Sequence, residues 1–219
     1  MKKLSLCLVL VLALSLMLWG CGNEEETYEK RDLSFGTIED GVYTNTYLGA
    51  SVAADGWTLE NAYDLGEQLK GLEGMELEGE QLEKHLDRFQ SILVFKMTNP
   101  ENAANVNILY DRLTTAEQRA ERKMSDRDIV DRFLKDRDQM IREMESSGME
   151  VESIDAAEVT WLGETCPAVR TLCESYGIPM CILTVTVHNL GNFDVMITAT
   201  ALTEEEAAEA LAMFQPLNP

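Results

Sequence analysis

Histidine, cysteine and paired carboxylate side chains are the groups in this chain whose types suit metal binding. His85 and His188 lie far apart, and neither has a second His or Cys at the spacing of a zinc site. Aspartates alternate with arginine at 126–128 and 136–138, but a calcium loop needs a glycine turn and a later glutamate. Both pairs fall in a predicted helix, where they are typical of a solvated face. We therefore predict no metal site and no cofactor.

Motifs for covalent or hydrolytic catalysis are missing from the sequence. The chain contains no Gly-x-Ser-x-Gly, no His-Glu-x-x-His and no glycine-rich phosphate loop after a strand. Cys166 would need a nearby base to act as a nucleophile, and neither histidine is close to it in sequence. The sequence thus predicts that the protein is not an enzyme.

Two further cysteines flank a predicted hairpin turn. If that turn is centred on Gly177, Cys173 and Cys181 are equidistant from it and lie opposite each other. Opposed strand residues have Cβ atoms about 4.5–5.5 Å apart, whereas a disulfide prefers ~3.8 Å, so local twist would have to close the gap. Cys173 and Cys181 are therefore a candidate disulfide, and two buried free thiols are the alternative.

The first 21 residues carry an export signal. Lys2 and Lys3 precede an uncharged apolar run over residues 4–18, a pattern typical of a secretory signal. The ending Leu18-Trp19-Gly20-Cys21 resembles a bacterial lipobox, which implies cleavage before Cys21 and lipidation of that residue. The alternative, an uncleaved transmembrane anchor, usually needs about 18–20 apolar residues or more. We predict a lipid-anchored protein at the outer face of the cytoplasmic membrane.

Charge limits the partners of this protein. The chain has 18 Lys and Arg against 39 Asp and Glu, a net charge of −21. Removing residues 1–20 removes two lysines and gives −23. Such acidity disfavours electrostatic binding to nucleic acid or to anionic lipid head groups. We expect no nucleic-acid partner.

The composition divides the chain into three parts. Residues 1–20 are the predicted signal peptide, and residues 21–36 have too few apolar groups to fold and are predicted to be an acidic flexible tether. Residues 37–219 are predicted to form one domain, because a chain of this size buries on the order of 70% of its surface without disulfides.

Basic residues gather in a stretch that overlaps one predicted helix, residues 125–147. Between Arg112 and Arg142 there are nine Lys and Arg against seven Asp and Glu. An acidic protein partner would meet the least repulsion here. The candidate docking residues are Arg127, Arg132, Lys135 and Arg142. The alternative is an ordinary solvated helix in which neighbouring aspartates neutralise these groups.

Apolar periodicity predicts the remaining elements. Ser125 and Thr203 are predicted N-caps, each with an acid three residues later. Helical spacing also follows Thr58 and recurs around Leu82 and Leu86. Strand patterns occur at 41–49, 50–54, 91–98, 104–111, 151–161, 165–174, 179–188 and 193–201. The short links between the last four strands predict an antiparallel meander.

Two features of this order carry a resemblance. The first is Gly41-x-Tyr43-x-Asn45-x-Tyr47-x-Gly49 followed by Gly56-Trp57, and the second is a long helix before a four-strand meander and a terminal helix. Together they resemble small secreted or lipid-anchored proteins of Gram-positive anaerobes, whose domain is similar to the PsbP-like fold of the photosystem extrinsic subunit. The resemblance implies a non-enzymatic accessory role. The fold class predicted is α+β, with a mainly antiparallel sheet of about six strands sandwiched by helices.

Two functions remain open at this point. The favoured one is an accessory module that binds an unidentified protein. The alternative is a small-solute-binding lipoprotein with an aromatic groove around Trp57, Trp161, Tyr43 and Tyr47, although such residues are also typical of a core.

Overall fold

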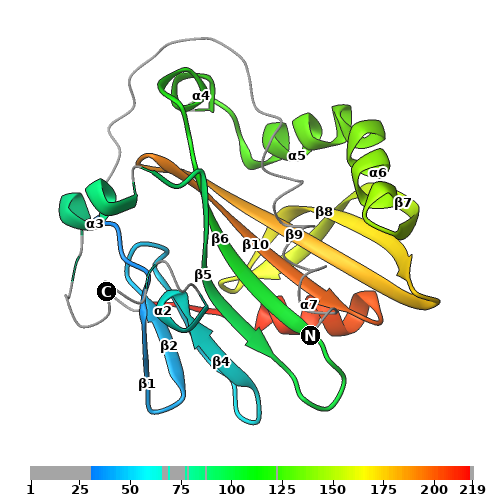
Figure 1. The fold of residues 1–219 in the computed structure, drawn as a ribbon, viewed down its shortest axis with the longest axis horizontal. Helices are drawn as coiled ribbons and strands as arrows, with labels where there is room; N and C mark the ends of the chain where they lie inside the picture. Colours follow the sequence, from blue (N-terminus) through cyan, green and yellow to red (C-terminus); the bar gives the residue numbers. More distant parts are fainter. Residues whose placement is uncertain are drawn as a thin grey trace.

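The computed structural model describes residues 31–65, 69, 77, 79–86, 88–121 and 123–217. A seven-stranded antiparallel sheet runs through this part of the molecule (Figure 1). Its strands, in spatial order, are β4 (Thr58–Asn61), β5 (Ser91–Thr98), β6 (Asn105–Arg112), β10 (Phe193–Ala201), β9 (Ile178–Leu190), β8 (Glu164–Ser175) and β7 (Met149–Trp161). The predicted α+β class with antiparallel strands is confirmed, and the meander β7 to β10 lies where the strand pattern placed it.

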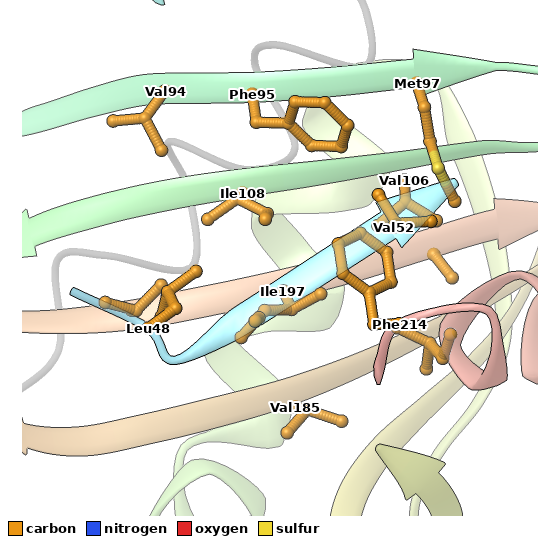
Figure 2. Close-up of a cluster of buried hydrophobic side chains, with 14 of the residues drawn as sticks. Leu48, Val52, Val94, Phe95, Met97, Val106, Ile108, Val185, Ile197 and Phe214 are labelled. Carbon is orange, nitrogen blue, oxygen red and sulfur yellow. The ribbon is translucent and has the colours of Figure 1, made fainter. Parts of the chain in front are cut away.

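A second sheet of four short strands packs on one face of the large sheet. It has the order β1 (Thr37–Glu39), β2 (Val42–Asn45), β3 (Ala50–Ala53) and β11 (Gln215–Pro216). Helix α7 (Glu204–Ala212) covers the same face, and Thr203 caps it as predicted. Figure 2 shows the core between these layers, where Val52 and Phe214 meet side chains of β5, β6 and β10.

The opposite face of the large sheet carries a second, smaller core. Strand side chains alternate between the faces, so that Ile108 belongs to the first core and its neighbour Leu109 to the second. Helices α5 (Asp126–Lys135) and α6 (Arg137–Ser146) cover this face through Ile129, Phe133 and Met144. None of the described helices is long and apolar enough to cross a membrane.

The predicted single helix over 125–147 is wrong, because the chain breaks at Asp136. This residue has φ −97° and ψ 8°, and its N–H bonds to the carbonyl of Phe133, three residues back. The large sheet is twisted, and a straight helix of this length would lift its apolar stripe off that surface. The break lets α5 pack on β7, β8 and β9 while α6 packs on β7.

The predicted helix start at Thr58 is also wrong. Residues Thr58–Asn61 form β4, which pairs with β5. The cap of the following short helix α2 (Ala62–Leu65) is Asn61, whose side-chain oxygen accepts hydrogen bonds from the N–H groups of Tyr63 and Asp64. Helix α3 (Gly79–Leu86) contains the predicted Leu82 and Leu86 on its buried side, whereas α4 (Thr115–Glu121) was not predicted.

The described end of the predicted tether belongs to the domain. Leu33 and Phe35 are buried in the first core, and the hydroxyls of Tyr43 and Tyr110 donate to the carbonyls of Phe35 and Ser34. Leu33 and Phe35 hold this segment on the domain, because buried side chains of the first core surround them. The predicted boundary at residue 36 is therefore wrong, and the domain includes residues 31–36.

Candidate functional site

Three carboxyl groups are buried where β6 ends, β10 begins and α4 crosses the sheet. Asp111 lies directly opposite Asp194 in the β6–β10 pairing, and Glu121 reaches them from the last turn of α4. Their exposed fractions are 4%, 2% and 0%. Buried carboxyl groups with perturbed pKa values are typical of functional sites, which makes this cluster the candidate site.

One cation enters the cluster. The guanidinium of Arg132, on α5, forms an ion pair with Glu121, and only 12% of its side chain is exposed. Arg132 therefore faces inward and is not available to a partner, so its assignment to the docking face was wrong. The helical period placed Arg132 correctly on α5. It could not show that a carboxylate of α4, that of Glu121, contacts this side chain.

Asp194 lies in a setting that favours its protonated form. Within the described residues neither of its carboxyl oxygens accepts a hydrogen bond, and Oε2 of Glu121 also lacks a donor. Burial and the charge of Glu121 raise the pKa of Asp194 well above its ordinary value. A proton on Asp194, donated to Glu121, satisfies oxygens on both side chains.

Asp111 is perturbed in the same direction but less strongly. Burial raises the pKa of Asp111 to about 6, and the hydroxyl of Ser91, which donates to its Oδ1 at 2.6 Å, works against this rise. Glu117 and Glu121 raise the pKa further by repulsion. Asp111 therefore changes charge close to neutral pH.

The cluster is closed to solvent, so in this conformation no substrate reaches it. Among the described residues no group of His, Cys, Asp and Glu could hold a metal ion. The sequence does contain one signal of the carboxyl cluster, which is an aspartate inside an apolar strand, Phe193-Asp194-Val195. A charged residue in an apolar strand is a local conflict that often marks a functional or strained site.

The histidines have separate structural settings. His188 contacts the Met124 carbonyl through Nε2 at 2.8 Å and the Asp126 carboxylate through Nδ1 at 3.0 Å, so it ties the start of α5 to β9. His85 is exposed on α3.

The predicted opposition of Cys173 and Cys181 is wrong. The β8–β9 turn is the two-residue loop Tyr176-Gly177, so Cys173 pairs with Met180. The observed pairing of β8 with β9 differs by one residue from the predicted pairing, and such a shift moves the side chains of a strand to the other face of the sheet. Cys181 therefore lies in the first core and Cys173 in the second. Both are free thiols, and burial raises the pKa of each to about 11.

Cys166 is also a free thiol and is half-buried. Burial, with the nearby charges of Asp126 and Glu164, raises its pKa. A nucleophilic cysteine needs the opposite shift, toward the thiolate.

The other candidate docking residues are exposed. Arg127 lies 4.0 Å from Glu158, a loose pair in which both side chains are more than half exposed. Lys135 and Arg142 are exposed on α5 and α6, and neither forms an ion pair with another described residue. These three residues define the basic face of α5 and α6.

The aromatic side chains of the predicted groove mostly contact other buried aromatic rings. Tyr43 stacks on Phe95 with ring centroids 3.9 Å apart, and Trp161 lies 4.8 Å from Phe214. Trp57 is half-buried and packs against the first core. Their faces are used for packing, and the alternative of small-solute binding remains a prediction.

Tyr43 and Asn45 of the spaced Tyr-x-Asn-x-Tyr motif form a buried hydrogen-bond network with Tyr110. Asn45 donates to the hydroxyls of Tyr43 and Tyr110 at 2.7 and 2.8 Å, and its Oδ1 accepts from the N–H of Leu48. Since the two hydroxyls bond to residues 34 and 35, the network fastens the N-terminal segment to the sheet.

Comparison with known proteins yields distant structural matches. No model of a known protein family matches the chain, and no curated protein matches it. The solution structure of cyanobacterial PsbP (CyanoP) from Synechocystis sp. PCC 6803 is similar at a TM-score of 0.39 and 10% identity, covering 89% of this chain and 98% of that one. That protein belongs to the family which the sequence pattern resembles. At this distance the match carries no argument about function.

Proposed function

We propose that this chain is a lipid-anchored, extracytoplasmic accessory protein, not an enzyme, which binds an acidic protein partner through the basic face of α5 and α6. The observation that carries the proposal is the exposure of Lys135 and Arg142, neither of which forms an ion pair within the described residues, on a chain of net charge −21. An exposed cation on an acidic protein is a favourable contact for an acidic partner.

The non-enzymatic part of the proposal is supported by the chemistry of the candidate site. Its carboxyl groups are closed to solvent, and the pKa values of the three described thiols are all raised. A catalytic group must reach its substrate, and a nucleophilic thiol must ionise easily.

Charge reversal tests the docking face. The double variant Lys135→Glu, Arg142→Glu should recover less partner than the wild type from membranes of the producing cell at low salt. Salt should weaken wild-type recovery, because charges are screened over about 10 Å at 0.1 M. The matched control is Lys84→Glu, Arg88→Glu on and beside α3, which makes the same change in charge at two exposed basic residues elsewhere. Equal losses in both double variants would refute the docking face.

Substitution of Cys21, which lies outside the described residues, tests the anchor. Cys21→Ser should remove the mass of the lipid and either release the domain to the aqueous phase or leave the signal peptide uncleaved, since two acyl chains are needed for stable attachment. Cys7→Ser, within the predicted signal peptide, should leave both properties unchanged. If Cys21→Ser changes neither mass nor partitioning, the protein is not anchored at this residue.

A further inference from the structure

The buried carboxyl cluster holds more negative groups than it can neutralise. Asp111, Glu121 and Asp194 face one guanidinium, that of Arg132. If all three carboxyl groups were ionised, the cluster would carry two uncompensated negative charges in a place from which water is largely excluded. Burying an unpaired charge is costly, so the cluster must retain protons to keep this packing.

The geometry narrows the retained proton to two carboxyl groups, those of Asp194 and Glu121. A proton on one of the two carboxyl groups supplies the donor that Oε2 of Glu121 and the oxygens of Asp194 lack, and Nε of Arg132 is likewise without a partner within the described residues. The pairing of β10 with β9 shifts register between Phe193 and Val195, where Asp194 on β10 faces two residues, 188 and 189, on β9. At this irregular position the carboxyl group of Asp194 interacts with Glu121, the last residue of α4.

We propose that Asp194, Glu121, Asp111 and Arg132 form a proton-dependent clamp, which holds α4 and its flanking loops on the sheet and releases them when its proton is lost. The clamp joins elements that the backbone connects only loosely: α4 contributes Glu121, α5 contributes Arg132, and the sheet contributes both aspartates. Without the proton, Asp194 and Glu121 repel each other across this junction, whereas Arg132 can compensate only one of them. This inference does not depend on the proposed partner.

Other charged groups near the cluster either add to the repulsion between its carboxyl groups or already have partners outside it. Glu117 on α4 repels Asp111, and the hydroxyl of Tyr47 lies near enough to Asp194 to be affected by its charge. His188 is engaged with Asp126, and Glu83 with Asn192, so each already has a partner. Arg132 is the one cation that acts on Asp194 within the described residues.

Hydrogen exchange of the full chain between pH 6.5 and 8 tests the clamp. After correction for intrinsic exchange rates, the opening equilibrium of residues 113–121 should rise about tenfold per pH unit in the wild type, because opening releases one proton. Asp194→Asn should remove this dependence, since an amide stays neutral and can donate to Glu121. The control Asp131→Asn, at an exposed carboxylate on α5, should retain the wild-type slope.

Equal slopes in the wild type and in Asp194→Asn would overturn the proposal. If Asp194→Asn does not fold, the carbon NMR signals of the Asp194 and Glu121 carboxyl groups in the wild type decide the matter. A protonated carboxyl signal at pH 7 supports the clamp. Ionised carboxyl signals from both Asp194 and Glu121 at that pH refute it.

Discussion

Asn45 shows how one polar residue can be buried completely at little cost. It has 0% exposure, yet its amide donates to two tyrosine hydroxyls and accepts from the N–H of Leu48. Buried polar groups are costly only when their partners are missing. The amide therefore stabilises the junction between β2, β6 and the N-terminal segment because every one of these bonds is made.

Replacing Asn45 by leucine should expose this dependence. Asn45→Leu keeps the approximate volume but leaves the N–H of Leu48 without its acceptor and removes the donor shared by two hydroxyls. We expect a loss of about 2–4 kcal/mol in the free energy of unfolding, measured by urea denaturation. Tyr110→Phe removes a single hydroxyl and should cost about 1–2 kcal/mol. A loss below that of Tyr110→Phe would contradict the central role of Asn45.

Asp111 should make stability depend on pH. Its pKa is raised to about 6 in the folded protein from 3.8, so the folded state holds the proton more tightly. Its contribution to stability is complete below about pH 4 and is lost as the pH rises to about 6, a change of about 3 kcal/mol. Asp111→Asn should remove that change. The free energy of unfolding of both proteins is measured at pH 4 and pH 7. Relative to the wild type, Asp111→Asn should be more stable at pH 7 than it is at pH 4. Parallel pH profiles of the two proteins would contradict the assignment.

At the scale of elements, the tight turns set the registers of the meander. Leu162-Gly163 and Tyr176-Gly177 both have positive φ at each central residue, and each joins strands whose flanking residues pair directly. This is the geometry of a type I′ turn, which favours asparagine or glycine at the first central position. Tyr176 has φ 55° and is 78% exposed, so it carries backbone strain without the benefit of burial.

Tyr176→Asn should therefore stabilise the protein. Asparagine tolerates the left-handed conformation better than an aromatic residue, and we expect a gain of about 1 kcal/mol in the free energy of unfolding. Thermal denaturation monitored by circular dichroism measures it. Gly177→Ala is the opposing variant and should destabilise the same turn, because its φ is 78°. A loss of stability in Tyr176→Asn would show that the tyrosine makes a contact worth more than the strain.

At the scale of the whole molecule, the N-terminal segment closes the first core. Leu33 and Phe35 are 5% and 2% exposed, and the carbonyls of Ser34 and Phe35 accept from buried tyrosines. A domain that begins at Thr37 would therefore expose apolar surface and leave two hydroxyls without acceptors.

Truncation tests this boundary. A chain that begins at Arg31 should unfold like the full chain in urea. A chain that begins at Thr37 should lose several kcal/mol, about 1.5–3 kcal/mol for each of the two buried side chains. Equal midpoints for the two truncated chains would return residues 31–36 to the predicted tether.

The sequence predicted what short-range pattern controls. Alternating apolar residues located β5 and the meander, Thr203 and Ser125 marked helix starts through their own side chains, and glycine marked the turns. Prediction failed where a tertiary partner overrode the local signal. Thr58 resembles a cap, but pairing with β5 makes it part of a strand. The apolar stripe around Asp136 is continuous in the sequence, although the helix is divided at that residue.

The candidate site depended almost entirely on tertiary structure. The sequence determined that the protein carries an export signal pattern, an excess of acid and an antiparallel α+β domain, because composition and periodicity are properties of neighbouring residues. Only the folded chain decided that Arg132 turns inward to Glu121, that Cys173 and Cys181 lie on opposite faces, and that Asp111 meets Asp194. Register and burial arise between segments distant in sequence, and a pKa depends on which charges and how much water those segments leave around a group.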